Sequence, residues 1–156
     1  MIKANKDLKL NNLLSLRKKI KQNEVEKEMR KIGVYLQKNN FKKSGPLLTS
    51  TFSVENIEGE HFLDMEILVP IDKEVELSGD YKFKKIFQLV NAVYARHEGS
   101  PNLLQETYNE IMRYIQNNNL QQITSAYNVN VKDLSLVDEI DDMIIDVYIG
   151  VSPNIL

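Results

Sequence analysis

The sequence predicts an α+β fold built from one unit that occurs twice. Residues 61–71, HFLDMEILVPI, form a strand that is mostly apolar on both faces and carries Glu66 near its centre. Residues 144–150, IIDVYIG, are a second short apolar strand with one central acid, Asp146. The order strand, helix, strand, strand fits both halves. We therefore expect a curved antiparallel sheet with two main helices and a cleft between pseudo-symmetric halves.

The repeat extends to the helices that precede these strands. Two copies are too few for a solenoid. We therefore expect halves of about 8–71 and 83–152 to pack around a pseudo-twofold axis inside one domain, 1–156. One shift of 80 residues pairs Glu66 with Asp146, so each half places an acid at an equivalent point. A shift of 79 pairs the two helical stripes: Val25 with Leu104, Met29 with Tyr108, Ile32 with Ile111 and Leu36 with Ile115, and likewise Asn39 and Asn40 with Asn118 and Asn119.

The first half contains a helix between strands. Asn23 is a good N-cap residue, and Glu26 three positions later completes a capping box for a helix over 23–38. The remaining expected elements are a strand over 8–20, a turn at 44–46, a strand over 47–54, a hairpin connection over 56–60 and the strand over 61–71.

The second half follows a polar linker over 72–82. Residues 83–96 suit either a strand or a helix, and the 79-residue shift favours a strand in their later part. Ser100 with Pro101 at the first helical position begins a helix that ends at residue 118. A strand over 123–131, an acidic loop over 132–142 and a strand over 143–151 complete the chain.

Composition restricts the chemistry. The 156 residues include no cysteine and only two histidines, so we expect neither disulfides nor a metal site, and no cofactor. No apolar run reaches about 18 residues, and the first residues lack the hydrophobic region of a signal peptide. We expect a cytoplasmic protein without a membrane partner.

The charge is unevenly distributed. Residues 1–45 carry 13 of the 20 Lys and Arg but only four of the 22 acids, which makes them strongly basic within a chain of net charge -2. The basic cluster at residues 17–21 has no interleaved aromatic residue or glycine. A solvated basic surface explains it as well as nucleic acid does, so we do not expect nucleic-acid binding.

Five segments in order resemble the gyrase-inhibitor-like (GyrI-like) small-molecule-binding domain, which also serves as the effector-binding domain of multidrug-responsive transcription activators. The resemblance covers about residues 8–152 and implies a cleft lined by aromatic residues with acids near its floor. The segments that carry it are Gly45-Pro46, 64–70 (DMEILVP), 95–99 (ARHEG), 103–108 (LLQETY) and 145–149 (IDVYI).

Residues 122–128 (QITSAYN) also resemble a branch from Gram-positive bacteria whose genes are associated with secreted toxins. Two residues depart from the drug-binding members. Asn128 stands where glutamate is frequent at the floor of the pocket, and Gly150 where the last strand usually has proline. No DNA-reading segment precedes residue 8, so we expect a domain that stands alone.

The resemblance places six residues in the ligand site. A carboxylate in an apolar cleft is desolvated, and a bound organic cation relieves that desolvation while it stacks on aromatic faces. For the three aromatic residues core packing is an equal alternative, and Glu66 could instead point to solvent. The expected ligand-binding residues are Glu66, Asp146, Tyr127, Tyr148, Phe52 and Asn128.

We do not expect an enzyme. His97 and Glu98 are neighbours and cannot share a strand face, no nucleophile pattern accompanies them, and the resemblance makes residues 97–99 a turn. We treat His61 as exposed. The leading hypothesis is a binding protein for a hydrophobic, cationic small molecule. The alternative is a protein-interaction module, gyrase-inhibitor-like or accessory to a toxin, with a protein partner.

Overall fold

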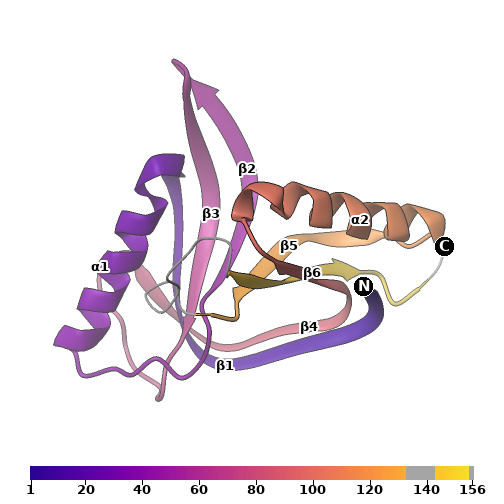
Figure 1. Cartoon of the computed structure of the whole chain (residues 1–156). Coiled ribbons are helices and arrows are strands. Elements are labelled where there is room, and N and C mark those ends of the chain that lie inside the picture. The colour runs from indigo at the N-terminus through magenta and orange to yellow at the C-terminus, as the bar shows by residue number, and fades with distance from the viewer. Residues whose placement is uncertain (133–142, 155–156) are drawn as a thin grey trace. The chain divides into compact units, whose positions relative to one another are not determined.

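The computed structural model describes residues 1–132 and 143–154. Within these residues six strands and two α-helices form the α+β fold that the sequence predicts, in the order strand, helix, strand, strand taken twice (Figure 1). Most of the acidic loop expected over 132–142 lies outside the described residues. The elements are β1 (Ile2–Lys21), α1 (Val25–Lys38), β2 (Leu48–Ile57), β3 (Glu60–Pro70), β4 (Tyr81–Glu98), α2 (Leu104–Asn117), β5 (Gln122–Asn130) and β6 (Ile144–Val151).

The chain divides into two compact units. One comprises Leu10–Phe87, and we call it the Glu66 unit. The other comprises Met1–Lys9 with Gln88–Leu156, and we call it the Asp146 unit. The long strands β1 and β4 contribute residues to both, so these boundaries differ from the expected repeats. The pseudo-twofold axis stays a prediction.

In the Glu66 unit, β3 pairs antiparallel with β1 on one side and with β2 on the other. Alternate residues of β3, Met65, Ile67 and Val69, pack with the stripe of α1, and Figure 1 shows α1 alongside β1 and β3. The expected stripe is confirmed, because Ile32 and Leu36 are buried and Val25 and Met29 pack against them. Glu66 alternates with these residues and therefore lies on the sheet face that turns away from α1.

The Asp146 unit repeats this arrangement. Strand β6 pairs antiparallel with β4 and with β5. Ile145, Val147 and Ile149 pack with the stripe of α2, which runs along β5 and β6 (Figure 1). Asp146 therefore lies on the face that turns away from α2.

Both helices end in the same way. Asn39 and Asn118 donate side-chain hydrogen bonds to the carbonyls of Tyr35 and Tyr114, at 2.8 and 2.9 Å. The next residues, Asn40 and Asn119, have φ values of 58° and 53°, the left-handed conformation that asparagine tolerates. The expected helix ends are confirmed, and the termination is the same at positions 79 residues apart.

The start of α1 was predicted wrongly. Residues Gln22–Glu24 form a 3₁₀ turn, and Glu24 is the N-cap of α1 without a side-chain cap. An N-cap side chain acts from a non-helical residue, whereas Asn23 already lies inside the turn, so it caps nothing. The second start is confirmed in part: Ser100 accepts a hydrogen bond from the Asn102 amide at 3.2 Å with Pro101 next to it, but the segment that it caps is a 3₁₀ turn, Pro101–Leu103, and α2 itself begins at Leu104.

Two strands are longer than expected. β1 begins at Ile2 and not at residue 8; its first ten residues alternate between half-buried and exposed, as a strand requires, although many are polar. β4 runs over Tyr81–Glu98, so residues 83–96, which suited either a strand or a helix, form a strand. The hairpin connection shrinks to Glu58 and Gly59, both at positive φ. No helix among residues 1–132 and 143–154 is long and apolar enough to cross a membrane.

Candidate functional site

The two acids occupy the same register position in their units. Arg17 lies opposite Glu66 in the β1–β3 pair, and Arg96 lies opposite Asp146 in the β4–β6 pair. The two arginines are 79 residues apart, as the shift requires. An arginine therefore lies opposite the acid in each unit, and the duplication itself stays a prediction.

Glu66 is 5% exposed and is held by two side chains. Ser15 donates a hydrogen bond to it at 2.6 Å, and the Lys84 ammonium lies 2.6 Å from the same oxygen. A carboxylate at this depth is tolerated because it is hydrogen-bonded and paired with a cation.

Arg17 lies opposite Glu66 and is bonded to another acid of β3. Its guanidinium makes two hydrogen bonds to Asp64, at 3.0 and 3.1 Å, and these bonds hold the pKa of that carboxyl below its usual value. The guanidinium carbon also lies 3.9 Å from the centre of the Phe52 ring. Phe52 thus already holds a cation on its face.

Asp146 is 9% exposed and has three hydrogen bonds from its own unit. Tyr94 donates at 2.8 Å, and Arg96 donates from two nitrogens at 2.8 and 3.0 Å. The hydrogen bond to Asp146 raises the pKa of Arg96. Burial, followed by the bond to Asp146, raises the pKa of Tyr94, so its hydroxyl keeps its proton and remains a donor.

Three tyrosines share the sheet face of Asp146. Tyr127 lies opposite Tyr148 across β5 and β6, and Tyr148 lies opposite Tyr94 across β6 and β4. The Tyr94 and Tyr148 rings are 5.1 Å apart, and the Lys6 ammonium lies 5.7 Å from the Tyr94 ring. Directly opposed residues of an antiparallel pair project to the same side. We call Tyr94, Tyr127, Tyr148 and Asp146 the tyrosine face.

A family model described as the GyrI-like small molecule binding domain matches residues 6–149. The chain belongs to the GyrI-like family. It is therefore a small-molecule-binding domain by family. No curated protein matches the sequence.

Solved structures share the fold of this GyrI-like domain at low identity. The C-terminal domain of EcmrR matches with a TM-score of 0.83 and 16% identity over 97% of each chain. The EcmrR chain in a DNA complex matches with a TM-score of 0.80 and 14% identity over 97% of this chain, which spans only 57% of that one.

Two further solved structures with this fold are described as a hydrolase and as a complex with a small molecule. A hydrolase from Listeria innocua matches with a TM-score of 0.64 and 12% identity, over 95% of this chain and 92% of its own. SAV2435 bound to tetraphenylphosphonium matches with a TM-score of 0.54 and 12% identity, over 97% of this chain and 94% of its own. At these identities the likeness shows the fold alone.

The structure brings together only some of the residues expected in the ligand site. Asp146, Tyr127 and Tyr148 share one face of the Asp146 unit. Glu66 and Phe52 lie in the Glu66 unit, where Arg17 lies opposite the first and stacks on the second.

Asn128 lies apart from them. It follows Tyr127 in β5 and lies opposite Val147, so its side chain points to the other face, where its amide nitrogen donates to the Tyr108 hydroxyl of α2. Its carbonyl oxygen is buried with no hydrogen-bond partner. Asn128 therefore faces the helix and not the tyrosine face.

The sequence reasoning missed the groups that hold the acids: Ser15 and Lys84 at Glu66, and Tyr94 and Arg96 at Asp146. The shift of 79 residues held a signal for some of them, since it pairs Ser15 with Tyr94 as well as Arg17 with Arg96. No comparable sequence signal identifies Lys84.

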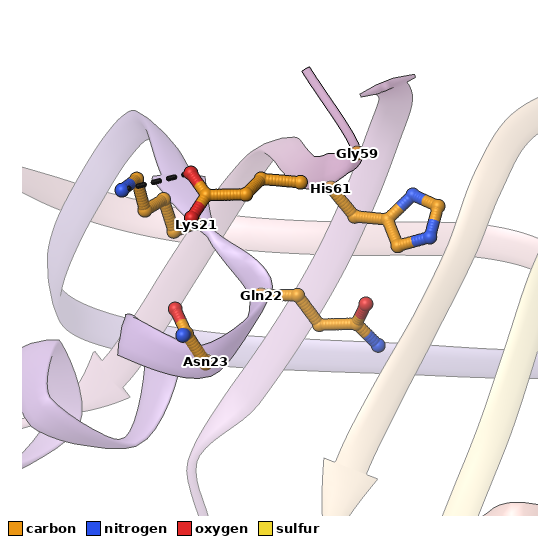
Figure 2. Close-up of a pocket in the computed structure, with 6 residues that line it drawn as sticks. Lys21, Gln22, Asn23, Gly59 and His61 are labelled. Atoms are coloured by element: carbon orange, nitrogen blue, oxygen red, sulfur yellow. Dashed lines mark ion pairs between the residues drawn. The ribbon is translucent and has the colours of Figure 1, made fainter. Parts of the chain in front are cut away.

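A cavity of about 300 Å³ lies at the end of the β2–β3 hairpin (Figure 2). The ion pair between Lys21 and Glu60, 2.9 Å long, lies on one side of it, and the His61 ring points away from that pair. His61 is exposed, as expected. None of the described residues that line it is Phe or Tyr, so this part of the chain supplies no aromatic wall for an organic cation there. Its lining residues are Lys21, Gln22, Asn23, Gly59, Glu60 and His61.

His97 is buried and fully hydrogen-bonded. One ring nitrogen lies 2.9 Å from the Thr107 hydroxyl, and the other lies 2.8 Å from the Ser100 carbonyl, which requires a donor. Gly99, which lies between His97 and Ser100 in the sequence, has a φ of 106°. The imidazole thus links the end of β4 to the start of α2.

Proposed function

We propose that this GyrI-like domain binds a hydrophobic, cationic small molecule on the tyrosine face, with Asp146 as its counter-charge. The proposal rests on the difference in solvent exposure between the side chains of Asp146 and of Arg96, which pairs with it. The Asp146 side chain is 12% exposed, whereas that of Arg96 is 44% exposed. Because Arg96 already reaches water, it can turn outward when the cation of a ligand takes its place.

The chemistry of the face suits such a ligand. Tyrosine rings attract a cation through their negative faces, and this attraction grows where water is removed. Tyr94 and Tyr148 lie close to each other, and burial raises the pKa of both, so they remain neutral phenols at neutral pH. The SAV2435 structure with tetraphenylphosphonium supports this ligand class, since that molecule is a cation enclosed by aromatic rings.

The proposal includes Glu66 and Phe52 in the same role within the Glu66 unit. The Lys84 side chain is 43% exposed, so it can also leave its acid, and Phe52 already accepts a guanidinium on its face. We propose no direct ligand contact for Asn128, because it faces α2.

Calorimetric titration with tetraphenylphosphonium tests the proposal. We expect Asp146→Asn to weaken binding about tenfold, equivalent to about 1.4 kcal/mol. Glu66→Gln should weaken it similarly if that acid belongs to the site. Arg96→Gln should strengthen binding, because it removes the internal competitor for Asp146. Glu55→Gln is the control, since it removes one negative charge from an exposed ion pair with Lys19.

Unchanged affinity in Asp146→Asn together with unchanged affinity in Arg96→Gln would remove the tyrosine face from the site. Triphenylphosphine oxide tests the preference for a cation separately from the preference for a hydrophobic molecule, because it has aromatic rings and no net charge. Equal binding of this neutral molecule would overturn the preference for cations and leave a hydrophobic site.

A protein-interaction module is the second candidate. The observation in its favour is that Val54 and Ile57 near the end of β2 are 59% and 45% exposed, one on each face of the strand, so each face presents an apolar side chain to a partner. A pull-down with the Val54→Ser variant as control tests this candidate: stoichiometric recovery of a partner by the wild type alone would favour it.

A further inference from the structure

A second cavity, of about 310 Å³, lies in the Glu66 unit beside α1. Leu16 and Lys18 contribute to it from β1, and they alternate with Arg17, so the cavity lies on the opposite sheet face from Glu66. None of its lining residues belongs to the site proposed above. The lining is Leu16, Lys18, Glu28, Lys31, Tyr35 and the segment 78–81.

Two tyrosines in tilted contact form an aromatic wall of this cavity. The Tyr35 ring of α1 and the Tyr81 ring are 4.7 Å apart and inclined by 53°. The Tyr35 hydroxyl lies 3.2 Å from the Ser78 amide nitrogen and 3.3 Å from its hydroxyl oxygen. These hydrogen bonds hold segment 78–81 against α1, so the wall is ordered before any ligand arrives.

A group of three charged side chains lies at the side of β1. The Glu28 side chain is only 11% exposed, with the Lys18 ammonium at 3.0 Å and the Lys31 ammonium at 3.5 Å. One carboxylate thus faces two ammonium groups. Lys31 is 53% exposed, so it can reach a ligand without losing Glu28. Asp80 is exposed in the same lining, so the two lysines and two acids carry no net charge, and the donors open to an anion are the half-exposed ammonium groups of Lys18 and Lys31.

We propose that this cavity binds a small planar aromatic carboxylate, packed against the rings of Tyr35 and Tyr81 with its carboxylate on Lys31 and Lys18. A volume near 300 Å³ is at the lower end for ligand sites, so one or two fused rings fit and a larger drug does not. The two ammonium groups supply donors for a carboxylate, and the partial desolvation by Leu16 and the rings strengthens the attraction. The site is independent of the tyrosine face, whose expected ligand carries the opposite charge.

Fluorescence titration of the full chain with 2-naphthoate tests this site. We expect Lys31→Gln to weaken binding at least fivefold, and Asp80→Asn to strengthen it, because that substitution removes the opposing charge. Lys27→Gln is the matched control: it removes one positive charge from the same helix at an exposed position outside the cavity lining. It should leave binding unchanged.

Two further measurements keep the test independent of folding and of the first site. Amide chemical shifts in two-dimensional NMR should move at residues 78–81 on addition of 2-naphthoate, and Asp146→Asn should not change its affinity. The amine 2-(aminomethyl)naphthalene has the same rings and the opposite charge. Binding of this amine as tight as that of 2-naphthoate, or equal loss of affinity in Lys27→Gln and Lys31→Gln, would overturn the proposal.

Discussion

Arg17 and Arg96 stand at equivalent register positions, and each makes two hydrogen bonds to a carboxylate: Arg96 to Asp146 opposite it, and Arg17 to Asp64. Asp64 is a second acid of β3, two residues before Glu66, and Lys84 pairs with Glu66. Ile144 stands at the corresponding position of β6, so Arg96 has no competing carboxylate there.

This difference predicts unequal effects of the two arginines on stability. Arg96→Gln leaves the buried carboxylate of Asp146 with the Tyr94 hydroxyl and without its cation, and we expect a loss of about 1 kcal/mol after allowance for solvent screening. Arg17→Gln removes an exposed pair, with side chains 53% and 32% exposed, and should lower the free energy of unfolding less than Arg96→Gln does. Urea unfolding of both variants measures the difference. Equal losses of unfolding free energy in the two variants would show that the burial of Asp146 does not make the Arg96–Asp146 pair more stabilising than the Arg17–Asp64 pair.

Gly150 is fixed by a close approach to Thr124. A Cβ atom at Gly150 would lie 2.7 Å from the Thr124 methyl carbon, and the Gly150 amide donates to the Thr124 hydroxyl at 2.8 Å. We expect Gly150→Ala to cost about 1–3 kcal/mol by overpacking, and Gly150→Pro to cost more because it also removes the donor. The close contact with Thr124 therefore favours glycine at this position.

A second substitution checks this explanation by thermal unfolding. Thr124→Ala removes both of the atoms that the new Cβ would meet first. The double variant Gly150→Ala with Thr124→Ala should therefore recover much of the stability that Gly150→Ala loses. Simple additivity of the two losses would contradict the steric account.

Asn128 and Tyr108 form a buried polar pair between β5 and α2. Asn128→Val alone leaves the Tyr108 hydroxyl without this partner, and Tyr108→Phe alone leaves the Asn128 amide without it, so each should lose about 1–2 kcal/mol. The double variant leaves no polar group to satisfy. We expect it to lose less than the sum, with a coupling of about 1 kcal/mol in a double-mutant cycle. Additive losses would mean that the hydrogen bond contributes nothing.

Much of the fold follows from periodic patterns that local physics fixes. The stripes ending in Leu36 and Ile115 have helical spacing, and Ser100 followed by Pro101 marks a helix start, so these features were predictable. The sheet face to which the Asn128 side chain points was also predictable, because adjacent residues in a strand point to opposite faces. The partners of the acids were not. A period of two tells which face Glu66 uses, but it cannot tell that Lys84, on another strand, reaches it.

Glu28 predicts how the Glu66 unit responds to acid. Burial alone raises the pKa of its carboxyl, but the hydrogen bond from Lys18 and the charges of Lys18 and Lys31 outweigh burial, so the pKa lies below its usual value. A carboxyl with a lowered pKa in the folded state stabilises it above the unfolded pKa, roughly 4.3. That contribution disappears as the pH falls through the lower, folded value.

We therefore expect the stability of the wild type to fall between about pH 5 and pH 3, and Glu28→Gln to be less stable at pH 7 with a shallower fall in this range. Urea unfolding at each pH measures both effects. Glu26→Gln is the control, because that residue lies on the same helix in an exposed, long pair with Arg30 at 3.9 Å. Parallel acid profiles of Glu28→Gln and the wild type would show that the two lysines do not stabilise the charged form.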